Sequence, residues 1–136
     1  MGNSGPKPFP LGSTALGVKT KMPRCPKHLD DTARKEWRRV APLLYEYGLL
    51  TEFDAAALAC YCQSFSRWVH CEGVLSKEGL TFITDKGYEG QKPEVVIASK
   101  CMKAIKDFCK EFGLTPNARG KMFLPNKPKD DKGFDF

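Results

Sequence analysis

Features that would define a membrane, secreted or catalytic protein are scarce in this 136-residue chain. It has no long apolar run that could cross a bilayer. Its first thirty residues hold Gly, Pro, Ser and Lys where a secretion signal would need an apolar stretch. The sequence therefore predicts a soluble, intracellular protein with no membrane partner.

Catalytic signatures are also missing. No glycine-rich loop leads into Lys-Ser or Lys-Thr, and residues 87–92 lack the spacing of a phosphate loop. The two histidines, His28 and His70, lie near no serine nucleophile motif. The acidic residues gather at expected helix starts, where capping explains them. We therefore expect a protein that is not an enzyme and that needs no cofactor.

Cysteine is present six times, which raises the question of a metal site. Cys25 and His28 have ligand-like spacing, and Cys60 and Cys62 are close in sequence. Residues two apart on a helix, however, point about 200 degrees from each other, so they cannot hold one ion without unwinding the helix. We interpret the cysteines as reduced, mostly buried thiols and expect no metal.

Positive charge is concentrated at the two ends of the chain, which has a net charge of +6. Residues 1–24 are rich in proline, glycine and bases, which predicts a disordered basic arm. Residues 123–136 form an expected flexible tail. Basic ends on a nearly neutral middle favour a polyanionic partner such as nucleic acid, although solubilising tails would give the same pattern.

A helix that begins at Thr51 organises the middle of the chain. Thr51 and Asp54 approximate a capping box, and Ala55, Leu58 and Phe65 follow at helical spacing. Alanines and aromatic residues leave the other faces of this helix largely uncharged as well. We therefore expect it to be covered on more than one side, in part by a second copy of the chain.

Two further helices and a hairpin are predicted around it. Periodic apolar residues indicate a helix from residue 29 to Gly48, and a second from Pro93 to Gly113. The helical pattern of the central segment fades after Gly73, and residues 80–90 read as a strand, a glycine turn and a return strand. The predicted fold is mainly α, with a three-helix core, a small β-hairpin between the second and third helices, and disordered termini.

Short motifs follow one another along residues 23–122: Cys25-Pro26-Lys27-His28-Leu29-Asp30, Ala33 with Trp37, Gly48-Leu49-Leu50-Thr51 with Asp54, Leu58 with Tyr61-Cys62, a hairpin after Gly79, Pro93, and Phe112-Gly113-Leu114-Thr115-Pro116 with Arg119. Their order closely resembles the small terminase subunits of tailed bacteriophages. The sequence departs from that family at residues 117–120, where a serine before the arginine is more usual, and along its amino-terminal arm. On this resemblance, residues 25–122 form the family's helical domain.

The resemblance implies a function in viral genome packaging. Members of the family are mostly helical, assemble into rings, bind viral double-stranded DNA and regulate the terminase large subunit, an ATPase and nuclease. This chain is then expected in the cytoplasm of the infected bacterial host. Two other readings of the residues remain open: a small dimeric helix-turn-helix-like DNA-binding regulator, and a metal-stabilised interaction module that binds no nucleic acid.

Site residues can be assigned to three predicted surfaces. The helix that starts at Thr51 presents acids at its first turn, so we place DNA contact instead on the arm and on the first helix, at Lys19, Lys21, Arg24, Lys27, Arg34, Lys35, Arg38 and Arg39. The helix-one bases could alternatively form a solvated face paired with Asp30, Asp31 and Glu36. The expected oligomer interface comprises Ala56, Ala59, Tyr61 and Trp68. The expected docking segment for the large subunit is Phe134-Asp135-Phe136.

Overall fold

The first helix begins and ends where nearby residues satisfy its free backbone groups. The computed structural model describes residues 21–116. Helix α1 spans Asp31–Glu46, and the carboxylate of Asp30 accepts a hydrogen bond from the Ala33 amide at 2.9 Å. At the other end Gly48 has a φ of 74°, and the Leu49 amide donates to the Leu44 carbonyl at 2.8 Å. This is a Schellman ending, so the predicted helix is confirmed, with each end lying two residues inside the predicted range.

The central helix follows a capping box. Thr51 and Asp54 bond reciprocally around a short 3₁₀ turn, η1 (Glu52–Asp54), and helix α2 then spans Ala55–Glu78. The predicted weakening after Gly73 was wrong, because α2 continues to Glu78 and ends at Gly79. An exposed glycine costs a helix only about 1 kcal/mol, and beyond it Leu75 is buried in a small cluster shared with α3. Packing against a neighbouring helix therefore outweighs the local propensity.

The predicted hairpin and third helix are also present. Strands β1 (Thr81–Ile83) and β2 (Glu89–Gln91) pair antiparallel, with Phe82 opposite Gly90. Helix α3 (Pro93–Glu111) has proline at its start and ends in a second Schellman motif, in which Gly113 has a φ of 69° and the Leu114 amide donates to the Cys109 carbonyl. The predicted fold class is confirmed: the described chain is mainly helical, with a hairpin between α2 and α3.

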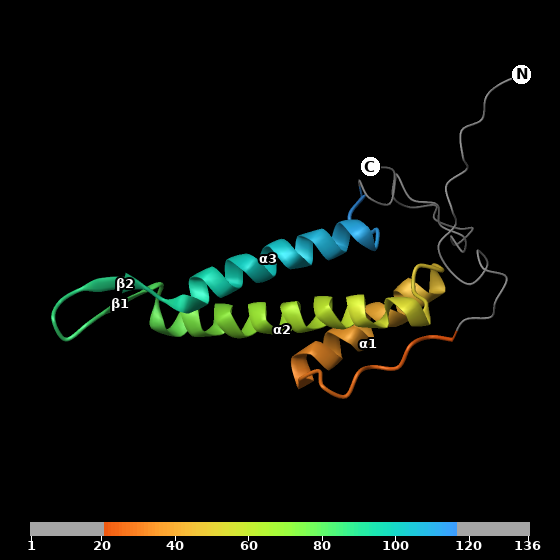
Figure 1. Cartoon of the computed structure of the whole chain (residues 1–136), viewed down its shortest axis with the longest axis horizontal. Coiled ribbons are helices and arrows are strands. Elements are labelled where there is room, and N and C mark those ends of the chain that lie inside the picture. The colour runs from red at the N-terminus through yellow and green to blue at the C-terminus, as the bar shows by residue number, and fades with distance from the viewer. Residues whose placement is uncertain (1–20, 117–136) are drawn as a thin grey trace, which may run out of the picture.

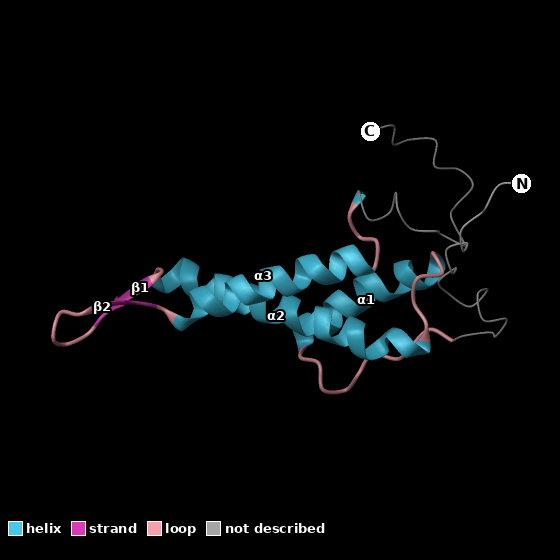
Figure 2. Cartoon of the chain, turned by 45° about the horizontal axis from the view of Figure 1, so that its top comes forward, coloured by secondary structure: helices cyan, strands magenta, loops and turns pink. Residues whose placement is uncertain are grey.

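The helices divide the molecule into two ends of different thickness. Helix α3 runs back along α2, while α1 packs only against the first part of α2 (Figure 1). The hairpin projects past the point where α2 ends and α3 begins, and it does so in both views (Figure 2). We call residues 21–66 and 105–116 the core end and residues 67–104 the hairpin end. Three helices meet at the core end, whereas only two meet at the hairpin end.

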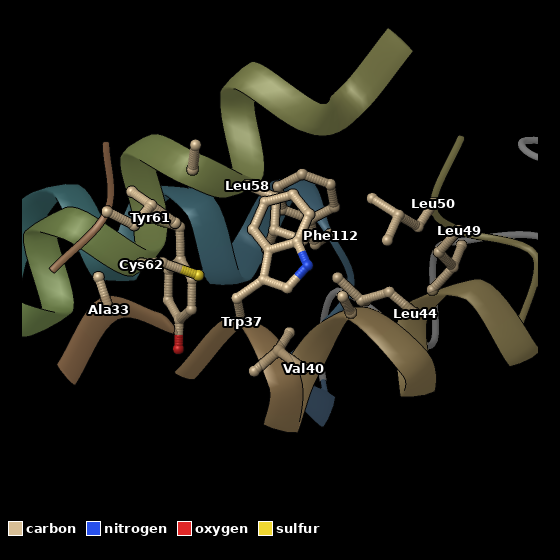
Figure 3. Close-up of a cluster of buried hydrophobic side chains, with 13 residues drawn as sticks. Ala33, Trp37, Val40, Leu44, Leu49, Leu50, Leu58, Tyr61, Cys62 and Phe112 are labelled. Atoms are coloured by element: carbon tan, nitrogen blue, oxygen red, sulfur yellow. The ribbon is translucent and has the colours of Figure 1, made fainter. Parts of the chain in front are cut away.

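The hydrophobic core lies almost entirely at the core end. Trp37 of α1 projects between α2 and α3 and lies beside Leu58 and Phe112 (Figure 3). The same cluster buries thirteen residues: Leu29, Ala33, Trp37, Val40, Ala41, Leu44, Leu49, Leu50, Leu58, Ala59, Tyr61, Cys62 and Phe112. At the hairpin end the buried cluster is limited to Cys71, Leu75 and Ala98. None of the helices between residues 21 and 116 is both long and apolar enough to span a membrane.

Candidate nucleic-acid interface

Helix α1 turns a basic face away from the core. Lys35, Arg38 and Arg39 recur at helical spacing on the side away from the buried residues Trp37 and Val40, and Arg34 lies at the edge of this face. Lys35 and Arg38 are exposed, and neither makes an ion pair with any residue in the range 21–116. Their charges are therefore available to a phosphate backbone.

The other two bases of this face are held by the protein itself. The Arg34 guanidinium donates to the Lys27 carbonyl oxygen at 2.7 Å. The Arg39 guanidinium donates through Nε to Glu36 at 3.0 Å and forms an ion pair with it. That hydrogen bond and the carboxylate charge raise the pKa of Arg39. Part of the basic face is therefore paired within the protomer. The pairing of Arg39 with Glu36 agrees with the alternative interpretation, in which acids of α1 pair with these bases.

Glu36 is a residue whose role the sequence analysis missed. Its side chain is only 4% exposed, and it accepts a hydrogen bond from the Tyr61 hydroxyl at 2.9 Å. Burial and this hydrogen bond to Glu36 raise the pKa of Tyr61 above its ordinary value. A signal was present, because Glu36 stands three residues after Ala33 and four before Val40, in register with the apolar stripe. Glu36 therefore joins α1 to α2 and also orients Arg39.

Asp30 makes a second polar connection between α1 and α2. Besides capping α1, its carboxylate accepts from the Ser66 hydroxyl at 2.6 Å and from the Gln63 amide at 2.9 Å. The Ser66 hydrogen bond, together with that from the Ala33 amide, lowers the pKa of Asp30. These bonds fix the start of α1 on α2, and Arg34 in turn fixes Lys27 on α1. Lys27, which precedes α1 in the chain, is therefore held beside the basic face.

The predicted arm residues that the structure describes all reach solvent. Lys21, Arg24 and Lys27 are exposed, next to the basic face of α1 in the chain. The Lys21 backbone amide donates to the Glu52 carboxylate at 3.3 Å, which leaves the Lys21 ammonium group uninvolved in that contact. Lys19 lies outside the described residues.

The residues expected at an oligomer interface separate into two pairs. Ala59 and Tyr61 are buried inside one protomer, because α1 and the end of α3 cover that side of α2. They have almost no surface left for another copy. Ala56 is exposed and Trp68 is partly exposed, so these two keep surface that a second copy could contact. The proposed docking segment, Phe134 to Phe136, lies outside the described residues.

Three of the six cysteines, Cys62, Cys71 and Cys109, favour the interpretation of inert thiols, whereas Cys60 is exposed. All six are free, and burial raises the pKa of the Cys62 thiol to about 12. Burial also raises the pKa of Cys71 and of Cys109. Raised values disfavour the thiolate that metal binding and nucleophilic attack require. Between residues 21 and 116, no three or more His, Cys, Asp or Glu side chains gather where they could share a metal ion.

The fold and this surface define a class of small helical protein. A long hairpin of two helices, α2 and α3, is joined by a shorter helix, α1, whose basic face points outward. A family model described as phage terminase, small subunit, matches residues 33–129. The chain therefore belongs to the small-subunit family of phage terminases. No curated protein and no solved structure matches it.

Proposed function

We propose that this terminase small subunit binds viral double-stranded DNA as an oligomeric ring and regulates the terminase large subunit during genome packaging in the host cytoplasm. In this role the subunit is not itself catalytic. Family membership supports the packaging context. The chemistry of its surface supports two more specific parts of the proposal, DNA binding and self-assembly.

Self-assembly is supported by the apolar surface of the hairpin end, which is the observation that carries the proposal. Ile83 and Tyr88 are each 73% exposed, and Leu80 is 60% exposed. Further large apolar residues are exposed on the same end: Val69, Phe82, Val96, Ile97 and Met102. Single exposed apolar residues are normal, but a set concentrated on one end is typical of an interaction surface. A two-stranded hairpin is also marginal when isolated, so contact with a second copy would stabilise it.

The mass of the assembled protein tests the ring. Native mass spectrometry at micromolar concentration should show a closed assembly of more than two subunits, because a ring joins one surface to a different one on the next copy. A monomer would remove the basis of the proposal. A stable dimer would favour the DNA-binding regulator.

DNA binding is supported by the arm and by the exposed bases of α1. Replacing Lys35 and Arg38 by glutamine should weaken binding to a duplex of viral sequence by about tenfold and reduce its salt dependence by about two phosphate contacts. The matched control replaces Lys77 and Lys86, which are exposed at the hairpin end. Fluorescence anisotropy at two salt concentrations measures both effects. Equal losses in the two variants would argue against a specific role for α1.

Regulation of the large subunit is assigned to the carboxyl-terminal segment. Apolar side chains on either side of Asp135 have the composition of a short docking peptide. Deleting residues 125–136 should leave the assembled mass and DNA binding unchanged but abolish stimulation of the large-subunit ATPase. The matched point variant replaces Phe134 and Phe136 by alanine. Undiminished stimulation by both variants would contradict the assignment.

A further inference from the structure

Helix α3 carries a second basic surface, which the sequence analysis did not single out. Lys100, Lys103, Lys106 and Lys110 are all exposed. Their spacing of three, three and four residues places them within about a third of the helix circumference. The buried residues of α3, Ala98 and Cys101, lie on the opposite side. We call these four residues the lysine stripe.

The charges of the lysine stripe are not neutralised within the protomer. Across the described range, the ion pairs join Arg39 to Glu36 and Lys92 to Glu78, and neither includes a member of the stripe. Two acids of α3, Asp107 and Glu111, lie along the edge of the stripe nearest Lys100. The edge formed by the other three lysines contains no acid of α3. Holding several like charges together this way is unfavourable unless water and salt, or an anionic partner, screen them.

We infer that the lysine stripe is a second phosphate-binding surface, which contacts the backbone of duplex DNA. This inference rests on the proposed DNA-binding function. Ten residues of helix rise about 15 Å, the length of about four nucleotides of one strand at 3.4 Å each. Lysine is a flexible point charge without the fork geometry that reads bases, so the stripe contacts phosphates and contributes no sequence preference.

The stripe is distinct from the basic face of α1. Helix α3 runs along α2 and carries the stripe, whereas the basic face belongs to α1, which packs on the first part of α2 (Figure 1). The stripe points away from α2, as the basic face of α1 also does. Each subunit therefore presents two separate surfaces to phosphates, one beside the arm and one on α3. The two can be removed independently.

A charge-removal experiment on the full chain tests the lysine stripe. The variant Lys100→Gln/Lys103→Gln/Lys106→Gln/Lys110→Gln keeps helix-forming side chains and removes only charge. Its affinity for a 30-base-pair duplex, measured by fluorescence anisotropy, should fall by on the order of 100-fold at low salt. The slope of log affinity against log salt should fall by about three to four, close to one for each lost contact. Random-sequence and viral duplexes should be affected equally.

Two further variants make the outcome specific to the stripe. The double variant Lys103→Gln/Lys106→Gln is compared with Lys77→Gln/Lys86→Gln, which removes the same charge from α2 and from the hairpin turn, outside the stripe. Only the first should change the salt slope, by about two. Asp107→Asn, which removes an acid beside the stripe, should tighten binding by about twofold or more. Circular dichroism and native mass should be unchanged in all of them.

The results separate this inference from the proposed function. If the unmodified protein binds duplex DNA and the quadruple variant binds it with the same affinity and slope, the lysine stripe is not a DNA surface and the function stands. The inference is also overturned if the control Lys77→Gln/Lys86→Gln loses as much affinity for duplex DNA as the matched double variant does. If the unmodified protein fails to bind any duplex, the proposed function and the inference fall together.

Discussion

The two ends of the molecule show how the same helical hairpin behaves with and without a third helix. At the core end α1 closes over α2 and α3, and Leu58 is 0% exposed. At the hairpin end α2 and α3 have only each other, and apolar side chains such as Ile83 remain in solvent. The difference indicates that the core end supplies the stability of one subunit. The hairpin end leaves apolar side chains exposed, and the proposed contacts between subunits are expected there.

The largest expected effect is the loss of a core leucine. Leu58→Ala should lower the free energy of unfolding by about 2–5 kcal/mol, because it removes buried methyl groups and leaves a cavity. Leu80→Ala, at a residue that is 60% exposed, should change it by no more than about 0.5 kcal/mol. Urea unfolding followed by tryptophan fluorescence compares the two variants. Similar losses would mean that the two ends contribute equally to the stability of a subunit.

A double substitution in the hairpin should act on assembly instead. Leu80→Ser/Ile83→Ser should weaken self-association by about 100-fold or more, because contact with another copy would bury these side chains and each would then contribute about 1.5 kcal/mol or more. The matched control is Leu43→Ser, which removes a leucine that is 50% exposed at the core end. Analytical ultracentrifugation over a concentration series gives the association constants. If Leu43→Ser has the larger effect, the contact surface lies at the core end.

High pH should destabilise the core end through a buried thiol and a buried tyrosine hydroxyl. Their raised pKa values mean that Cys62 and Tyr61 stay protonated in the folded chain while the unfolded chain ionises. The contribution of these groups to the free energy of unfolding is therefore fully present below about pH 9. It falls as the pH rises above their pKa values in the unfolded chain, by up to about 1.4 kcal/mol per pH unit for each group. Tyr61→Phe should make this fall shallower. An identical pH profile for the two proteins would show that Tyr61 does not contribute.

The smallest expected effect concerns a glycine at the hairpin end. A Cβ atom added at Gly73 meets nothing within 4 Å in one subunit. Gly73→Ala should therefore raise the free energy of unfolding of the protomer by about 0.5–1 kcal/mol through helix propensity. If another copy packs closely here, the same substitution should weaken assembly, while Ser76→Ala on the same helix should not. Unchanged assembly would place the contact away from Gly73.

Local signals predicted the elements of this fold well. Asp30, the pair Thr51 and Asp54, and Pro93 begin helices by satisfying or sparing backbone amides within three residues. Gly48 and Gly113 end helices because a left-handed residue is needed there. These interactions involve only near neighbours in the chain, so they can be read from the order of the residues.

What only the tertiary structure decided is which face of each helix is covered, and by what. Tyr61 looked available to another subunit and Glu36 looked solvated, yet the two meet in the interior. The length of α2 beyond Gly73 likewise depended on its packing against α3. Periodicity identifies an apolar face but not its partner, because burial depends on residues that are distant in the chain. The sequence by itself determined where the helices start and stop; their packing decided that one end of the hairpin is enclosed and the other is left exposed.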